Sequence, residues 1–316
     1  MASYKHIIIT RYSVTNLRSP VQSWFRNLDV MDEARLRLRL QVFKFATFPS
    51  IANQLDQDFD WIILIDSQLP GNHRSELESL IRQRPRTHIV THDPRIKVWR
   101  GQWIRDRFND ANAPILTTLL DDDDALPSNF TDRMRHLLQG ALSVEVSMGP
   151  RVFAYYDVDQ WDLRFDNSTP LGVKAPWHRR RYNNTRYPSA CGLSLLIPNR
   201  YYDLSVLSIP HVNADLIFNT DFEARDRDAK NAVRLLRRAA RQAGDDWRDW
   251  STTTQFKSLD ELMRPAVLIN HHFNDQEQRL HEQKWTVKRV TGPETFPDIA
   301  LDWEAIALYA GIESEH

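Results

Sequence analysis

Short apolar runs alternate with longer amphipathic segments along the first 140 residues. The apolar runs are rich in β-branched and aliphatic residues, which predicts buried strands at His6 to Thr10, Trp61 to Ile65, His88 to Thr91 and Ile115 to Leu120. Apolar residues recur at helical spacing in Glu33 to Leu55, Ser75 to Arg82 and Gly101 to Ala111. This alternation predicts a parallel sheet with helices on its faces.

The pattern changes after residue 140. Strands are predicted at Leu142 to Ser147, Arg151 to Tyr156, Leu193 to Ile197 and Ala266 to Ile269, and the polar stretch from Gln160 to Arg186 is predicted to be mostly loop. Asp226 to Gln242 reads as a basic amphipathic helix, which indicates either a solvated surface helix or one that meets an anionic membrane surface. No repeat or clear linker interrupts the chain, so we expect one domain over residues 1–316.

Composition narrows the class of protein. Hydrophobic residues make up 41% of the 316 residues, which is typical of a globular chain, and the formal charge of −1 creates no general attraction to nucleic acid. The only cysteine is Cys191, which we interpret as structural and which fits a reducing compartment. No apolar run approaches about 18 residues, so we expect a cytoplasmic protein that could meet the inner face of the membrane only peripherally.

Several polar residues follow predicted strands directly. Arg11 follows the first strand, Asp66 the second and Asp121 to Asp124 the strand at Ile115 to Leu120. Ligands of open parallel sheets bind beyond the carboxyl ends of the strands. The common placement of these residues therefore predicts a binding site at this edge.

The run of four aspartates is the most informative stretch. Adjacent carboxylates repel one another unless water or a cation compensates them, and Mg²⁺ and Mn²⁺ prefer such oxygen ligands together with substrate phosphates. We expect Asp121 and Asp123 to be the metal-binding pair, although Asp122 and Asp124 form an overlapping Asp-x-Asp. Acidic runs are also commonly inert and solvated. A run that directly follows an apolar strand differs, because the rigid end of the strand can hold its side chains in a fixed direction toward a ligand.

This part of the chain resembles the GT-A glycosyltransferases, whose pattern is a glycine, a helix with Ala-Arg-Asn and a strand ending in Leu-Asp-x-Asp-Asp. Gly101 to Asn109 and Ile115 to Asp124 correspond to that pattern, with Asp106 where the family has asparagine. The resemblance implies that Arg105 contacts the donor diphosphate or braces the metal carboxylates. A surface arginine is the alternative interpretation of Arg105.

The resemblance extends to the N-terminal residues. It implies that Arg11 and Tyr12 lie in a nucleoside-contacting loop, where Tyr12 could stack on the base, and that Asp66 touches the base or ribose. An ordinary loop tyrosine and an aspartate that caps a turn are the alternatives. Ile9 to Tyr12, Trp24 to Arg26, Arg35 to Phe48 and Leu119 to Leu126 together resemble the bacterial rhamnosyltransferase family.

The fold implied by the resemblance is α/β, a GT-A-like (Rossmann-like) open and mostly parallel sheet flanked by helices. Residues 1–140 would form the nucleotide-sugar-binding lobe, and residues 141–316 a mixed α+β acceptor lobe with C-terminal helices. Inverting transfer needs a general base, and we select Asp215 because it lies early in an apolar segment. The other candidates for this role are His211, Asp221, Glu223, Asp245 and Asp246. The family often completes its metal shell with a C-terminal histidine, which implies His271 or His272, and we prefer His272.

These observations predict an enzyme that transfers a hexose or deoxyhexose from a nucleotide sugar to a hydroxyl of a glycan or a lipid-linked acceptor. The donor site would comprise Arg11, Tyr12, Asp66, Arg105, Asp121 and Asp122, and the metal ligands would be Asp121, Asp123 and His272. A divalent cation, Mn²⁺ or Mg²⁺, is the expected cofactor, and no nucleic acid partner is expected. The alternative is a non-catalytic nucleotide- or carbohydrate-binding protein of the same fold.

Overall fold

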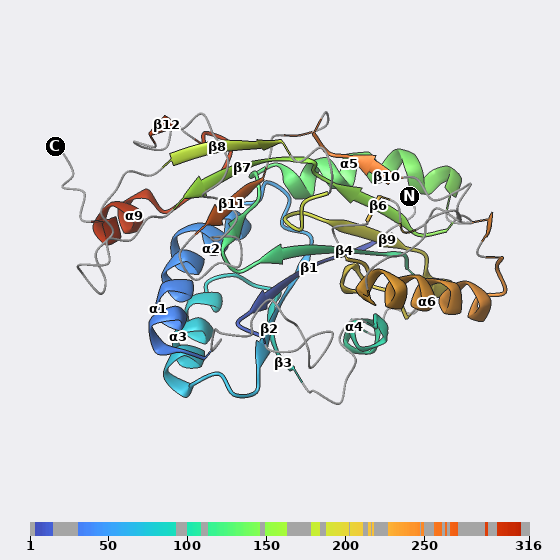
Figure 1. The fold of residues 1–316 in the computed structure, drawn as a ribbon, viewed down its shortest axis with the longest axis horizontal. Coiled ribbons are helices and arrows are strands. Elements are labelled where there is room, and N and C mark those ends of the chain that lie inside the picture. Colours follow the sequence, from blue (N-terminus) through green and yellow to red (C-terminus); the bar gives the residue numbers. More distant parts are fainter. Residues whose placement is uncertain are drawn as a thin grey trace.

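The computed structural model describes residues 4–14, 31–92, 100–108, 113–145, 149–162, 178–183, 188–201, 203–210, 214–215, 217, 227–246, 248–249, 256–260, 263, 266–270, 288–289 and 296–310. Two sheets and their covering helices make up these residues (Figure 1).

A seven-stranded sheet forms the centre of the molecule, in the order β10-β6-β9-β4-β1-β2-β3. Its strands are β1 (Lys5–Tyr12), β2 (Asp60–Asp66), β3 (Thr87–His92), β4 (Ile115–Asp121), β6 (Arg151–Ala154), β9 (Ser194–Ile197) and β10 (Phe256–Ser258). Only β9 runs against its neighbours, so all six other strands end at one edge. The expected open, mostly parallel α/β sheet is thereby confirmed.

Alternating side chains of these strands enter two separate hydrophobic cores. Ile8 and Ile63 pack with the helices α1 (Glu33–Val42), α3 (Gly71–Ile81) and α5 (Phe130–Glu145) on one face. Ile7 and Ile9 pack with α4 (Gln102–Phe108) and α6 (Arg227–Gln242) on the other face, and Figure 1 shows α4 and α6 together on that side. Burial on both faces explains why the strands read as continuous apolar runs.

A smaller, five-stranded sheet has the order β12-β8-β7-β11-β5. Its strands are β5 (Asp124–Ala125), β7 (Asp157–Asp162), β8 (His178–Asn183), β11 (Val267–Asn270) and β12 (Lys288–Arg289). Ala125, Val267 and Ile269 pack in a third core against the end of α1 and against α9 (Trp303–Ala310). The chain therefore passes from the large sheet to the small one within the aspartate run, between Asp121 in β4 and Asp124 in β5.

A π-helical segment interrupts the first long helix. Phe43–Thr47 forms this segment, and Phe48–Ala52 continues as helix α2. Pro49 lacks an N–H and its ring would collide with the carbonyl one turn earlier, so a widened turn before it accommodates the proline. Two 3₁₀ turns, Asn199–Tyr201 and Val206–Ser208, complete the described helical elements.

Two predictions from the second half of the chain are wrong. Residues 142–145 lie at the end of helix α5, not in a strand, because the amphipathic helix that begins at Phe130 continues through them. Strand β8 and the last three residues of β7 fall within the stretch expected to be loop, and the two strands pair with each other over six residues. Polar residues can form strands when the backbone pairing is supplied by a neighbour distant in sequence.

Candidate functional site at the carboxyl edge of the sheet

The ends of β1 and β4 place an arginine directly beside the first aspartate of the run. Arg11 and Asp121 are Cα partners in the register of the two parallel strands. The Arg11 guanidinium donates from Nε and Nη2 to both carboxylate oxygens of Asp121, at 2.5 to 2.9 Å. Burial lowers the pKa of Arg11, but the attraction of Asp121 outweighs it and the net shift is upward. The pair is only partly buried, so water weakens it.

A second arginine reaches the run from helix α1. Arg39 Nε donates to Asp122 Oδ2 at 2.8 Å, and its Nη2 contacts Asp122 Oδ1. The side chain of Asp122 is 0% exposed and that of Arg39 is 14% exposed. Burial raises the pKa of Asp122 although Arg39 opposes the shift. Arg39 therefore compensates a carboxylate that has no access to water.

The last two aspartates are held between the two sheets. Asp123 is 8% exposed and Asp124 is 4% exposed. Asp124 pairs with Leu268 of β11, and the backbone of Ile269 hydrogen-bonds its carboxylate. Burial and the neighbouring carboxylates raise the pKa of Asp124 well above its usual range. The run is thus rigid and concentrates negative charge in a poorly solvated position.

Cys191 packs against this run. Its thiol is buried, lies 3.9 Å from the carbonyl oxygen of Ala125 and has a pKa raised by burial and by the nearby aspartates. A protonated, enclosed thiol is not a nucleophile. The structural interpretation of Cys191 agrees with this placement.

The oxygen-rich run has the donor chemistry that a hard divalent cation prefers. Within the described residues, however, no group of three or more histidine, cysteine, aspartate or glutamate side chains stands in the arrangement of a preformed metal site. Arg11 donates two bonds to Asp121 Oδ1 and one to Oδ2, so Oδ2 keeps a second lone pair that a cation could use. His272, the expected third ligand, lies outside the described residues.

A second carboxylate cluster lies beyond the end of β6, at the same edge. The hydroxyl of Tyr156 donates to Asp215 Oδ2 at 2.8 Å, and the backbone N–H of Tyr156 donates to Asp260 at 3.1 Å. The second oxygen of Asp215, Oδ1, is buried and has no hydrogen-bond partner among the described residues. An unsatisfied buried acceptor is costly, so Oδ1 is suited to accept a hydrogen bond from a ligand.

The structure places Arg105 away from this edge, which contradicts its expected role. Its guanidinium lies 3.4 Å from the carbonyl oxygen of Pro198 and 3.5 Å from that of Ala113. Ala113 precedes β4, whereas Asp121 ends it, and six strand residues span about 20 Å. Arg105 thus donates hydrogen bonds to backbone carbonyl oxygens at the amino end of β4. Helix α4 precedes β4 in the chain and places the arginine at that end of the strand.

Tyr12 also differs from its expectation. Its ring is 0% exposed and meets Phe43 edge-on with centroids 5.7 Å apart, so it is part of the core and does not present a face for a base to stack on. Asp66 does end β2 at the carboxyl edge, and its Oδ1 accepts the backbone N–H of Gln68 at 2.9 Å. This contact is the turn-capping arrangement that was the alternative interpretation of Asp66.

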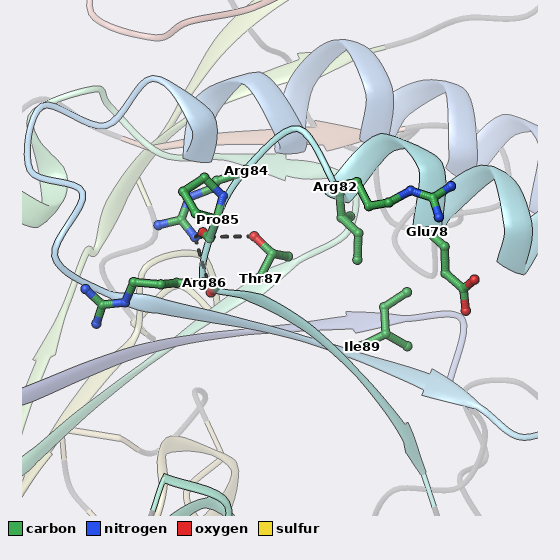
Figure 2. Close-up of a pocket in the computed structure, with 8 residues that line it drawn as sticks. Glu78, Arg82, Arg84, Pro85, Arg86, Thr87 and Ile89 are labelled. Carbon is green, nitrogen blue, oxygen red and sulfur yellow. Dashed lines mark hydrogen bonds between the residues drawn. The ribbon is translucent and has the colours of Figure 1, made fainter.

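The described residues also form a hollow of about 390 Å³ at the opposite edge of the sheet. Figure 2 shows it between the end of α3 and the start of β3, with Glu78, Arg82, Arg84 and Arg86 around it. Arg84 packs its guanidinium 4.0 Å from the ring centroid of Phe59 and donates to neighbouring backbone carbonyls. The hollow is therefore a feature of the amino edge and is separate from the aspartate run.

Sequence reasoning did not identify Arg39 or Tyr156. Arg39 stands in the alternation Arg-Leu-Arg-Leu-Arg-Leu, which does not show which face of the helix is buried. The available signal was its position four residues after Arg35, on the same face of the helix, and Arg35 is buried in the structure. Tyr156 had no signal beyond its position at the end of a predicted strand. Both contacts join segments far apart in the chain.

The fold and the aspartate-ended strand define an α/β protein with a carboxylate-rich edge at the carboxyl end of its parallel strands. Residues 24–157, less than half of the chain, match the family described as "Putative rhamnosyl transferase". Over these residues the match confirms the family resemblance seen in the sequence. No curated protein matches the chain.

Solved structures match the chain only at low similarity. Residues 1–349 of S. aureus TarS match at 10% identity and a TM-score of 0.35, covering 84% of this chain and 60% of that one. The same fragment in complex with UDP-GlcNAc matches at 9% identity and 0.38, covering 98% and 66%. A 4-diphosphocytidyl-2C-methyl-D-erythritol synthase matches at 10% identity and 0.31, covering 97% and 99%. This chain thus spans 60% and 66% of the two TarS fragments.

Proposed function

We propose that this protein transfers a sugar from a nucleotide-diphosphate donor to a hydroxyl of a glycan or a lipid-linked acceptor. The family description favours rhamnose as the sugar, and dTDP-rhamnose is then the donor that the resemblance implies. The observation that carries the proposal is the buried aspartate run at the carboxyl end of β4, where a parallel sheet binds its ligands. Asp121 and Asp122, each engaged by an arginine, stand at this end.

The donor would bind along the ends of β1, β2 and β4. Arg11 and Asp66 border this position, and Arg11 could exchange part of its contact with Asp121 for an oxygen of the diphosphate. Asp121 and Asp123 would hold the divalent cation, with His272 as a further proposed ligand. When bound, such a cation neutralises the charge that develops on the departing diphosphate.

Asp215 would act as the general base toward the acceptor hydroxyl. Its Oδ2 is engaged by Tyr156, while Oδ1 is buried with no partner among the described residues. An acceptor hydroxyl could donate to Oδ1 and pass its proton there as the glycosidic bond forms. Strand β6, which precedes Tyr156, is two strands from β4 in the sheet, and two strand spacings are about 10 Å. A sugar donor could span that separation.

Two measurements test the proposal. First, thermal unfolding is followed with UDP, GDP and dTDP, each with and without Mn²⁺. One nucleotide should raise the midpoint by several degrees only when Mn²⁺ is present. Second, nucleotide release from the corresponding sugar nucleotides should depend on Mn²⁺ or Mg²⁺. A midpoint that no nucleotide shifts, with no release from any donor, would contradict the proposal.

Matched aspartate variants locate the site. Asp121→Asn and Asp123→Asn should abolish transfer while the protein still unfolds cooperatively. Asp106→Asn, an exposed change of the same chemistry on helix α4, should leave transfer unchanged. If Asp123→Asn retained full activity and unchanged metal dependence, the assignment of Asp123 would be wrong.

The alternative function is a non-catalytic protein that binds a nucleotide or a carbohydrate through the same edge. It predicts a nucleotide-dependent thermal shift without release of nucleotide from any sugar donor. A cytoplasmic location with peripheral contact to the inner face of the membrane is part of our proposal for the transferase. No described helix has both the length and the apolarity required to cross a bilayer.

A further inference from the structure

Helix α6 carries a continuous stripe of positive charge on its exposed face. The exposed basic residues of the helix are Lys230, Arg234, Arg237, Arg238 and Arg241. Their spacing of three and four residues places them along one side of an α-helix, over about 16 Å of its length. The sequence has no acidic residue from Ala229 to Ala243 that could interrupt the stripe.

This arrangement is unfavourable within the isolated molecule. Like charges at four-residue spacing, such as those of Arg234 and Arg238, destabilise a helix because they repel each other on one face. Lys230, Arg234, Arg238 and Arg241 form no ion pair with any residue that the structure describes. Other exposed arginines of the described surface include paired ones, such as Arg74 with Glu78, and ones without an ion pair among the described residues, such as Arg82. The stripe is therefore suited to an anionic partner outside this chain.

The opposite face of α6 is committed to the core. Ala232, Leu236, Ala239 and Ala240 are at most 5% exposed and pack with the strands of the central sheet. The helix therefore cannot insert an apolar face into a bilayer. Only the charged ends of its basic side chains are available for contact with a membrane. In Figure 1 α6 lies at the outer margin of the molecule, beside α4. The exposed side of the helix is cationic, which suits contact with an anionic surface.

We propose that the basic stripe of α6 docks this protein electrostatically on a bilayer of anionic phospholipid. Nucleic acid is the less suitable polyanion, because residues 227–242 contain no aromatic side chain that could stack on bases and the whole chain has a formal charge of −1. Clustered lysine and arginine residues near an anionic leaflet each strengthen binding by about fivefold. The inference rests on α6 alone and does not require the transferase activity.

Vesicle sedimentation tests the proposal without any substrate. The full chain is mixed with vesicles of phosphatidylglycerol and phosphatidylcholine in equal parts, or of phosphatidylcholine alone, at 0.05 and 0.5 M NaCl. We expect binding to the anionic vesicles at low salt, loss of that binding at high salt and no binding to phosphatidylcholine. Binding to both lipids, or binding that salt does not weaken, would overturn the proposal.

A pair of double variants locates the contact. Arg234→Gln/Arg238→Gln removes two charges from the stripe and should weaken binding to anionic vesicles by about 25-fold. Arg82→Gln/Arg133→Gln removes two exposed arginines from other helices and should weaken it by much less, at most about threefold. Equal losses in the two variants would assign binding to net charge and overturn the role of α6.

Two controls separate lipid docking from altered stability and from affinity for nucleic acid. The α6 variant should unfold at the same temperature as the wild type or slightly above it, because repulsion along the helix is relieved. A double-stranded oligonucleotide should compete poorly with the vesicles at 0.15 M NaCl. Tighter binding to the oligonucleotide than to the vesicles would make nucleic acid the partner and overturn the lipid proposal.

Discussion

The hydroxyl of Tyr156 donates a 2.8 Å hydrogen bond to one oxygen of the Asp215 carboxylate and leaves the other oxygen buried and unsatisfied. Tyr156 is held in turn by Asp260, which accepts its backbone N–H, and by Phe256, whose ring meets its own edge-on at 5.3 Å between centroids. Burial and the bond to Asp215 raise the pKa of the Tyr156 phenol, so it remains a donor. Tyr156 thereby orients Asp215 and is a positioning residue for the proposed base.

This relationship predicts different effects for two variants. Asp215→Asn should lower kcat for transfer by about 10²–10⁴-fold, because it removes the proposed proton acceptor. Tyr156→Phe should lower kcat by about tenfold and leave KM for the donor nearly unchanged, because the carboxylate loses the hydrogen bond that orients it. Both variants are measured by kcat and KM for transfer at pH 7.

The chain offers a matched control for the second change. The hydroxyl of Tyr201 donates to Asp245 near the end of α6, so Tyr201→Phe also removes a bond between tyrosine and aspartate. It should leave kcat and KM for transfer unchanged. If Tyr156→Phe behaved like Tyr201→Phe, then Tyr156 would have no positioning role.

Loss of Arg39 should destabilise the protein more than loss of any exposed arginine. Arg39→Leu leaves the carboxylate of Asp122 buried without its counter-charge, which typically costs about 3–5 kcal/mol of unfolding free energy. Arg37→Leu, on the same helix, removes an exposed, solvent-screened pair with Glu33 and should hardly change the unfolding free energy. Urea unfolding at pH 7 measures both values.

A double variant distinguishes charge compensation from packing. Arg39→Leu/Asp122→Asn should recover a large part of the stability lost in Arg39→Leu, because the buried charge is removed with its partner. A double variant that is as unstable as the single one would show that Arg39 acts mainly through packing.

Gly101 is required by a close backbone approach. A Cβ at this position would lie 1.9 Å from the carbonyl oxygen of Leu204, which is backbone and cannot rotate away. Gly101→Ala should therefore lower the unfolding free energy by roughly 1–3 kcal/mol or more, as overpacked substitutions do. Gly71→Ala is the control, because nothing lies within 4 Å of a Cβ there and the stability should hardly change. Equal midpoints for the two variants would contradict the clash.

His6 should give the protein a measurable pH dependence of stability. Burial lowers the pKa of His6 to about 3, and its Nε2 lies 2.9 Å from the hydroxyl of Thr118. The unfolded chain binds a proton near pH 6.5 that the folded chain does not, so stability is complete above pH 6.5 and falls as the pH decreases toward 3. This single group should cost about 2 kcal/mol between pH 7 and pH 5.

The corresponding variant removes that dependence. His6→Phe keeps a buried ring beside Phe59, and Thr118 keeps its 2.8 Å bond to Ser194. The stability difference between pH 7 and pH 5, measured by urea unfolding, should be smaller in His6→Phe by about 2 kcal/mol. An unchanged difference would mean that His6 does not titrate in this way.

Much of the central sheet could be predicted from local patterns. The apolar runs that begin at Trp61 and Ile115 were correctly predicted as strands and correspond to β2 and β4. A strand that is buried on both faces reads as a continuous run of β-branched and aliphatic residues, which is easy to recognise. The aspartate run was found for the same local reason. By contrast, Arg105 was assigned by analogy of spacing, and spacing cannot reveal that α4 turns its arginine toward the amino end of β4.

The second half could be predicted less well. Strands β7 and β8 consist largely of polar and charged residues, so their period-2 pattern carries no apolar signal, and only pairing with each other and with β11 makes them strands. The π-helical turn before Pro49 was not predicted, because helical spacing of apolar residues does not distinguish an α-helix from one that contains a single widened turn.

The amino-acid sequence by itself determined the α/β order of the first half and the position of four acids at the end of a buried strand, because both depend on neighbours along the chain. Only the tertiary structure decided how those acids are compensated. Arg11 reaches Asp121 across 110 positions and Arg39 reaches Asp122 across 83, through strand register and helix packing. A charge inside a protein is stabilised by whatever lies within a few ångströms of it in space, and that neighbourhood exists only after folding.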